Sequence, residues 1–197
     1  VFGARADMFR RPFIARLMTF IRILPMVRQR DGLRNVLQNN DTQEIIVRTL
    51  EHDVPFILFP ERSHRTKHSL QQLGKGAFRI ALAANAKFGT EKPVYLVPAG
   101  IEYGDYFRYR STCLVNYGKP INVTDFLKEG SFDSEPHAID ALRKLLASRI
   151  KELITYIPDD ENYESKWTLL KMCSIKGKRK GYGDFGTDLY ESMKENR

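Results

Sequence analysis

Short apolar runs that alternate with amphipathic segments constrain the fold of this chain more than any other feature. Three runs have the length and composition of buried strands: residues 54–59, 94–101 and 111–117. Apolar residues at three- and four-residue spacings predict helices over residues 8–24, 73–88 and 139–157. Helices that alternate with buried strands predict an α/β fold, with a mixed, largely parallel sheet covered by helices.

The first of these helices can be placed in two ways. Pro12 lies near its start, so a start of the helix at Pro12 is the alternative to a start at Met8, and Pro25 ends the helix. Its apolar side is formed by Phe9, Phe13, Leu17, Phe20 and Leu24. We favour packing against a core with arginines outside, because most amphipathic helices of globular domains are packed. The alternative is a helix that lies on an anionic membrane surface.

A shorter helix is predicted from a capping motif. Asp41-Thr42-Gln43-Glu44 has the form of a capping box, whose first and fourth side chains satisfy backbone amides at a helix start. The helix should therefore begin there and run through about Glu51. Near the other end of the chain, Trp167 among apolar neighbours predicts a C-terminal helix that docks on the domain.

Length and charge give broad limits. The 197 residues suffice for one domain with a sizeable core, which we expect over residues 1–175. Residues 176–197 form a basic, glycine-containing tail that is poorly suited to a core. The net charge of +8 favours anionic partners, such as phosphorylated metabolites, anionic lipid surfaces or nucleic acid. Simple solubility explains the charge equally well.

Cysteine usage and hydropathy argue against several classes of protein. Cys113 and Cys173 lack the spacing of a zinc site or a disulfide framework, so we expect no metal and a reducing compartment. No run of about 18 apolar residues predicts a membrane-spanning helix, and no signal peptide is evident. Val1 opens a segment that reads as the interior of a domain, so we expect the chain to be N-terminally incomplete.

The most informative polar cluster follows the first apolar run. It consists of Glu61, Arg62, His64 and Arg65. In α/β folds, ligands bind beyond the carboxyl ends of strands. Two arginines can fork onto phosphate oxygens while a neighbouring carboxylate orients a hydroxyl or an arginine. The cluster therefore predicts a phosphate site, and a solvated charged turn is the simpler alternative.

Two further segments have features that suit phosphate. Lys75-Gly76 opens a predicted helix, where backbone amides favour anions. Arg28 and Arg30 would share one face of an extended chain, because alternate residues of a strand point the same way. Arg-x-Arg pairs are common on protein surfaces, so this second pattern is informative only beside the others.

Three of these segments together resemble a known family. Phe59-Pro60-Glu61 with its basic cluster, followed by Leu73-Gly74-Lys75-Gly76, resembles the third block of the 1-acyl-glycerol-3-phosphate acyltransferases. Residues 23–28 resemble the second block and residues 96–101 the fourth. The order and spacing agree, and the resemblance covers about residues 4–120. It implies a glycerolipid-acyltransferase-like fold.

The resemblance also implies an activity. In this family a fatty acyl group passes from acyl-CoA or acyl carrier protein to the free hydroxyl of a lysophospholipid such as 1-acyl-glycerol-3-phosphate. By the same resemblance, Arg28 and Glu61 are the strongest matches for holding the glycerol phosphate, and Arg65 is a weaker one. His64 stands where the family usually has arginine. No bound cofactor is implied, and the expected location is cytoplasmic, peripheral at the inner face of the membrane.

One family element is missing from the chain. The family's base is a histidine with an aspartate five residues later, and none of the four histidines here has one. They are His52, His64, His68 and His137. We therefore expect the catalytic pair upstream of Val1 and expect this chain alone to be inactive. The alternative is a non-catalytic relative that binds lipid or a membrane surface.

A nucleic-acid-binding module is a third hypothesis. It would use the basic tail and the aromatic and arginine residues between Tyr103 and Arg110. No recognisable nucleic-acid motif supports it, and a hairpin with one solvated face explains the same aromatic residues. Nucleic acid is therefore the partner that we expect least.

Overall fold

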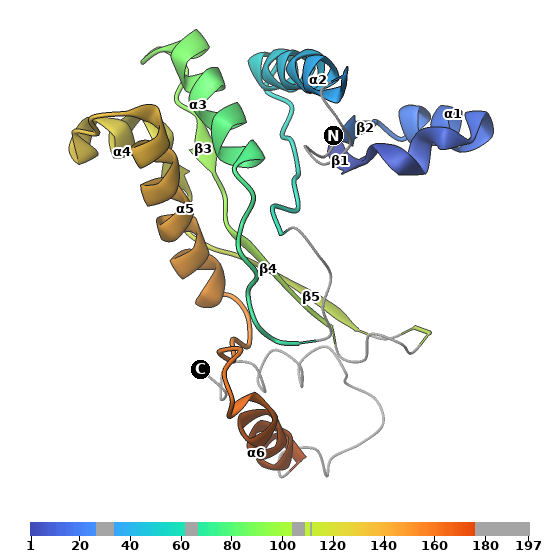
Figure 1. Cartoon of the computed structure of the whole chain (residues 1–197), viewed down its shortest axis with the longest axis vertical. Coiled ribbons are helices and arrows are strands. Elements are labelled where there is room, and N and C mark those ends of the chain that lie inside the picture. Colours follow the sequence, from blue (N-terminus) through green and yellow to red (C-terminus); the bar gives the residue numbers. More distant parts are fainter. Residues whose placement is uncertain (27–33, 62–66, 104–108, 111, 176–197) are drawn as a thin grey trace. The chain divides into compact units, whose positions relative to one another are not determined.

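The computed structural model describes residues 1–26, 34–61, 67–103, 109–110 and 112–175 (Figure 1). The chain forms two compact units, and each is considered by itself. Unit 1 comprises Val1–Pro60, Gly74–Val94 and Val123–Lys128. Unit 2 comprises Glu61–Leu73, Tyr95–Asn122 and Glu129–Arg197. The predicted single domain over residues 1–175 stays a prediction, and the predicted tail lies outside the described residues.

Unit 1 begins with a small parallel sheet. Strand β1 (Phe2–Arg5) pairs with β2 (Ile23–Met26), with Phe2 opposite Ile23. Ile57 lies on the other side of β1, where its N–H donates to Val1 O at 2.9 Å and its carbonyl accepts from Gly3 N–H at 3.1 Å. The predicted strand over residues 54–59 is therefore extended, but the prediction that it is buried is wrong, because Ile57 and Phe59 are exposed.

The helix predicted over residues 8–24 is split and shorter. A 3-10 helix (Ala6–Arg10) precedes α1 (Pro12–Phe20), and β2 follows. Arg11 between them is extended, with φ −90° and ψ 125°, because a proline disfavours helical geometry in the residue before it. Neither helix has a buried residue, so the expected packing of this segment in the core is wrong.

Two longer helices form the core of unit 1. Helix α2 (Arg34–Glu51) packs against α3 (Gly76–Phe88). Among the α2 residues whose burial is described, Ile46 and Val47 are buried apolar residues, and in α3 the buried residues are Phe78, Ile80, Ala81 and Ala84. Asp41 lies inside α2, so the predicted capping box is wrong; the helical segment continues through a motif that is only a local preference.

An exposed ion pair joins α2 to α3, and the next helix adds to the core of unit 1. Lys87 Nζ lies 2.6 Å from Glu51 Oε2, and this hydrogen bond lowers the pKa of the Glu51 carboxyl below its ordinary value. Helix α4 (Val123–Gly130) begins beside α3, where Thr124 Oγ1 donates to Asn85 Oδ1 at 2.6 Å. The N–H of Val123, which is fully buried, donates to Val94 O at 2.9 Å.

Unit 2 contains two antiparallel pairs. Strand β3 (Tyr95–Leu96) pairs with β6 (Ile121–Asn122), and β4 (Ala99–Tyr103) pairs with β5 (Cys113–Tyr117). The single strand predicted over residues 94–101 is thus two strands. The break falls at the buried Pro98, which has no N–H to donate to a ladder.

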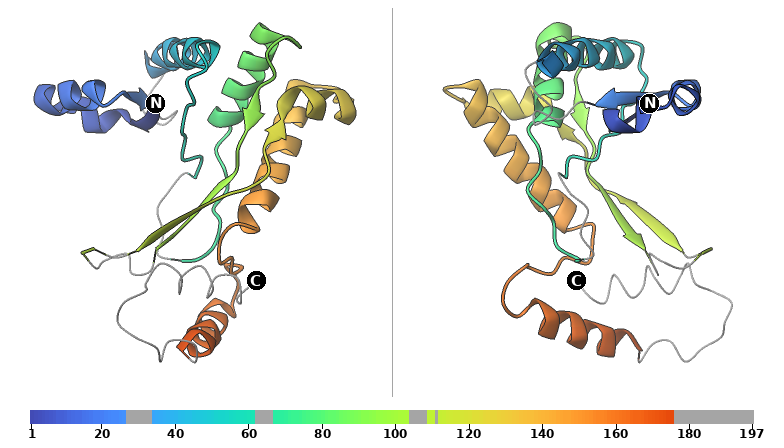
Figure 2. Two further views of the ribbon diagram at one scale, coloured as in Figure 1. Left: turned by 180° about the vertical axis from the view of Figure 1, so that it is seen from behind. Right: turned by 45° about the vertical axis from the view of Figure 1, so that its right-hand side comes forward.

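Helix α5 (Glu135–Lys151) packs against β4 (Figure 2). Its buried residues are Ala138, Ile139, Leu142, Leu146 and Ile150. The helix begins four residues before the predicted Ile139 and ends six residues before the predicted Ile157. The sequence thus predicts its buried face better than its ends. Helix α6 (Tyr163–Ile175) follows, as predicted around Trp167.

Within the described ranges, one strand pair is parallel and two are antiparallel. The glycerolipid-acyltransferase-like fold stays a prediction. No described helix combines the length and apolar character needed to cross a bilayer.

Candidate functional site

Glu61 is the member of the predicted phosphate cluster that the structure describes. Its backbone forms an antiparallel bridge with Leu73, which is only 2% exposed. Its Oε2 accepts a hydrogen bond from Gln71 N–H at 3.3 Å, while the residue remains exposed. The carboxylate is thereby oriented by the backbone of its own segment and stays within reach of a ligand hydroxyl or guanidinium.

The remaining predicted arginines and His64 belong to two segments, residues 27–33 and 62–66. Arg28, Arg30, Arg62, His64 and Arg65 all lie outside the described residues. Along the sequence, the last three fall between the bridged residues named above. The predicted phosphate clamp thus stays a prediction for these five side chains.

The start of α3 carries the other predicted residues, in unit 1. Lys75 is the N-cap, with φ −75° and ψ −12°, and its carbonyl accepts from Arg79 N–H at 3.1 Å. A Cβ on Gly76 would meet no atom within 4 Å, whereas one on Gly74 would lie 3.3 Å from Pro60 O. The first turn of α3 is therefore open beside Gly76, and backbone amides at a helix start favour an anion.

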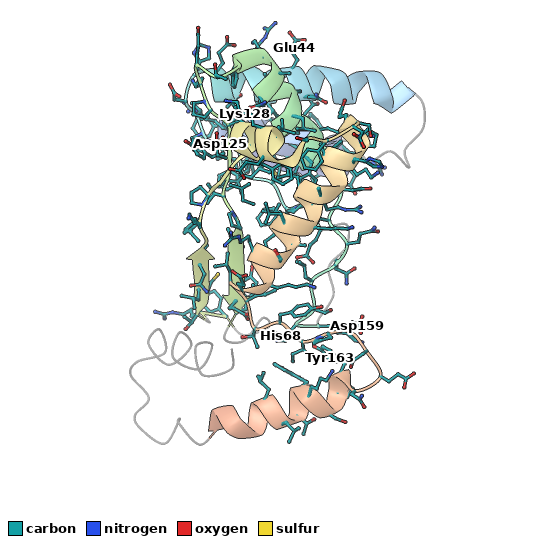
Figure 3. The ribbon with its side chains drawn as sticks, turned by 90° about the vertical axis from the view of Figure 1, so that its left-hand side faces the viewer. Glu44, His68, Asp125, Lys128, Asp159 and Tyr163 are labelled. Carbon is teal, nitrogen blue, oxygen red and sulfur yellow. The ribbon has the colours of Figure 1, made fainter. Side chains whose placement is uncertain are left out.

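The structure also reveals a cluster around His68 that the sequence did not predict (Figure 3). The imidazole stacks on Trp167 with ring centroids 4.3 Å apart and an interplanar angle of 27°. Its Nδ1 lies 3.6 Å from Glu102 Oε2. The His68 N–H donates to Tyr163 Oη at 2.7 Å, and its carbonyl accepts from Ile157 N–H at 2.7 Å.

Glu102 is the buried partner in this cluster. It is 6% exposed, on β4, and its Oε1 accepts a hydrogen bond from Thr155 N–H. Buried carboxylates require such partners, since an isolated buried charge is costly. A glutamate inside an otherwise apolar strand was the available signal, but the predicted strand ended one residue earlier, at Ile101.

Charged residues continue the cluster toward α6. Lys67 Nζ lies 2.5 Å from Asp159 Oδ1 and 4.7 Å from the centroid of the Tyr163 ring. The hydrogen bond to Asp159 raises the pKa of the Lys67 ammonium above its ordinary value. Residues 67 and 68, directly after the predicted basic cluster in sequence, are thus held by α6 and by the segment that precedes it.

The described parts of the chain contain no group of three or more histidine, cysteine or acidic side chains arranged to hold a metal ion. The chemistry that the described residues offer is recognition: an oriented carboxylate at Glu61 and an open helix start at Gly76. A histidine beside a buried carboxylate is also present, but at 3.6 Å the two atoms are beyond hydrogen-bond distance.

Comparison with known proteins gives one informative similarity. The chain is 30% identical, over 102 residues, to glycerol-3-phosphate O-acyltransferase 2 of Saccharomyces cerevisiae. This match covers 52% of the chain and 14% of that relative's length. No family model matches the chain, and no solved structure does. The similarity supports a relationship to glycerolipid acyltransferases, at the level of that class.

Proposed function

We propose that this chain is part of an enzyme that transfers a fatty acyl group to a free hydroxyl of a glycerol phosphate. The observation that carries the proposal is the agreement of two sources. The three ordered blocks around Arg28, Glu61 and Pro98 resemble acyl-glycerol-phosphate acyltransferases. The chain is also similar to a glycerol-3-phosphate O-acyltransferase.

The reaction joins the acceptor's oxygen to the acyl carbonyl carbon and breaks the carbon–sulfur bond of a thioester. The donor is acyl-CoA or acyl carrier protein, the thiol leaves, and the hydroxyl proton passes to a base. In this proposal the base lies upstream of Val1. The acceptor is 1-acyl-glycerol-3-phosphate or glycerol 3-phosphate itself, which share a phosphate and a free hydroxyl.

In this function Glu61 is a binding residue. Its carboxylate is oriented by Gln71 N–H and exposed, so it can accept a hydrogen bond from the acceptor or hold an arginine that contacts the phosphate. Arg28, Arg30, Arg62, His64 and Arg65 are proposed to supply the phosphate contacts. The open first turn of α3 at Lys75 and Gly76 offers a second anion site.

The test measures thiol release from acyl-CoA by the full-length gene product, with each acceptor in turn. Replacing Glu61 by Ala should lower kcat/KM for the acceptor by about tenfold to a hundredfold, because a charge-assisted hydrogen bond contributes about 1.5–3 kcal/mol. The kcat/KM of Glu61→Gln should lie between those of the wild type and Glu61→Ala, since an amide oxygen still accepts a hydrogen bond.

Glu91→Ala is the matched control, because Glu91 is an exposed glutamate in another loop. It should leave kcat/KM unchanged. If Glu61→Ala matches Glu91→Ala, Glu61 does not bind the acceptor. If the wild-type enzyme releases no thiol with either acceptor, acyl transfer to a glycerol phosphate is the wrong function.

A further inference from the structure

Helix α1 has apolar residues on two sides, and the described part of the chain covers only one of them. Ile14, Ala15 and Met18 are half-buried. The other side carries Phe13, which is 77% exposed, and Phe20, which is 84% exposed, with Leu17 also exposed between them. A helix that is apolar nearly all round is normally covered on all sides.

The exposed residues form one continuous stripe. Phe13, Leu17 and Phe20 stand at four- and three-residue spacings, which place them on one face of an α-helix. Ile21, at the C-cap, continues the stripe and is exposed as well. Protein surfaces normally expose single, scattered apolar residues. Two phenylalanines and two aliphatic side chains together on one face form a larger apolar patch than that.

Positive charge surrounds this stripe. Arg16 lies on α1 itself, Arg10 and Arg11 precede it, and Arg22 follows it, and all four are exposed. Asp7 is the acidic residue of the first 26, against five arginines. The stripe and its charges therefore match a partner that is apolar inside and anionic at its surface.

We propose that α1 is a lipid-docking helix that lies on an anionic bilayer surface. Phe13, Leu17 and Phe20 enter the boundary between headgroups and acyl chains, and the flanking arginines contact lipid phosphates. Anionic lipids line the cytoplasmic leaflet, so the docking fits a peripheral protein at the inner face of a membrane. The proposal extends beyond acyl transfer and does not depend on it.

Nucleic acid and protein partners fit this surface less well. A phosphate backbone would use the arginines but would leave a phenylalanine stripe in water. A protein groove would cover the stripe, but it would need acidic residues placed at both ends of α1. A bilayer meets the apolar and the charged requirement at once, without a specific complementary shape.

The experiment is co-sedimentation of the 197-residue chain with vesicles of phosphatidylcholine, with and without phosphatidylserine. We expect binding that needs phosphatidylserine and weakens at high salt. The double variant Phe13→Ser/Phe20→Ser should lower the partition coefficient by about tenfold or more, since each buried apolar side chain contributes separately. Its melting temperature should equal that of the wild type, because neither side chain is buried.

Two matched variants complete the test. Leu169→Ser removes an exposed apolar residue from α6 and should leave vesicle binding unchanged. Arg11→Gln/Arg16→Gln should weaken binding to phosphatidylserine vesicles selectively. Wild-type binding by the phenylalanine variant would overturn the proposal. A second result would also overturn it: light scattering without lipid shows the wild-type chain as a dimer and the phenylalanine variant as a monomer. The stripe would then be covered by a second copy of the chain.

Discussion

Helices α1 and α5 share a sequence pattern but differ in what covers them. Both show apolar residues at three- and four-residue spacings, and both were predicted to pack on a core. α5 buries five of its residues, whereas α1 buries none. The spacing of apolar residues thus shows that a helix has an apolar face, but it does not show which partner covers that face.

The residue types differ in a way that helps to explain the contrast. The buried face of α5 consists of Ala, Ile and Leu, which interdigitate with neighbours at high density. The exposed face of α1 is dominated by phenylalanine, with arginine close by. Bulky aromatic residues beside arginines are typical of a surface that meets lipid headgroups. The residue types on an apolar face therefore help to identify what covers it, whereas the spacing of the apolar residues does not.

The largest expected effect is a loss of stability when the buried face of α5 is changed. Leu142 is 0% exposed, so Leu142→Ala leaves a cavity in the core of unit 2. The free energy of unfolding should fall by about 2–5 kcal/mol. Chemical denaturation followed by circular dichroism measures the change.

The matched substitution on α1 is Phe20→Ala, at a residue that is 84% exposed. Its effect on unfolding should stay within about 0.5 kcal/mol, as for most surface changes. Comparable losses for the two variants would show that α1 is packed and would remove the contrast.

A smaller effect concerns the strand beneath α5. A Cβ on Gly100 would lie 2.7 Å from both Leu153 O and Ile154 Cγ2, so Gly100→Ala requires the backbone after α5 to move. We expect a loss of about 1–3 kcal/mol in the free energy of unfolding, which is typical of overpacking. Gly76→Ala is the control, because the corresponding space is empty and no loss is expected. A thermal melt of both variants decides the point.

The smallest effect concerns α6, whose start is held by charges. Lys166 Nζ lies 2.5 Å from Asp160 Oδ2, and this hydrogen bond lowers the pKa of the Asp160 carboxyl. A carboxyl whose pKa is lowered by folding stabilises the protein above its unfolded pKa, and the contribution is lost as the pH falls through the folded pKa. Asp160→Asn should therefore be slightly less stable than the wild type at neutral pH.

The difference between Asp160→Asn and the wild type should disappear below about pH 4, where aspartate protonates in the unfolded chain and then in the folded one. Urea midpoints measured across that range test the sign. A difference that grows as the pH falls would contradict the assignment of the ion pair.

The sequence predicted the interiors of most elements better than their ends. Four of the five buried residues of α5 and all of β5 lie within the predicted segments, whereas β4 runs two residues past the predicted end at Ile101. Over residues 8–24 one residue overrode the continuing pattern: the extended Arg11 interrupts the helix, and α1 begins at Pro12, the start that this proline indicates. The helix start predicted at Asp41 failed for the opposite reason, because the helix continues through a local capping preference.

The residues of the candidate site also differ in how well the sequence predicts them. Local signals predicted Glu61 as a carboxylate after an extended segment and Gly76 at a helix start, and the structure agrees with both placements. The His68 cluster joins residues about 34 and 99 positions apart in sequence, at Glu102 and Trp167. A single sequence carries no periodicity that links such distant positions, so this cluster emerges only from the folded chain.

The anchoring of His68 has a consequence for how the chain could be cut. Tyr163 and Trp167 both belong to α6, so loss of that one helix would remove the hydroxyl and the ring that hold the histidine. Glu102 and Ile157 would remain as its partners. A protease that cleaves just before Tyr163 would thus remove two of the contacts that hold His68. The segment that follows the predicted phosphate cluster would then be less firmly held, although the cut lies about 95 residues away in sequence.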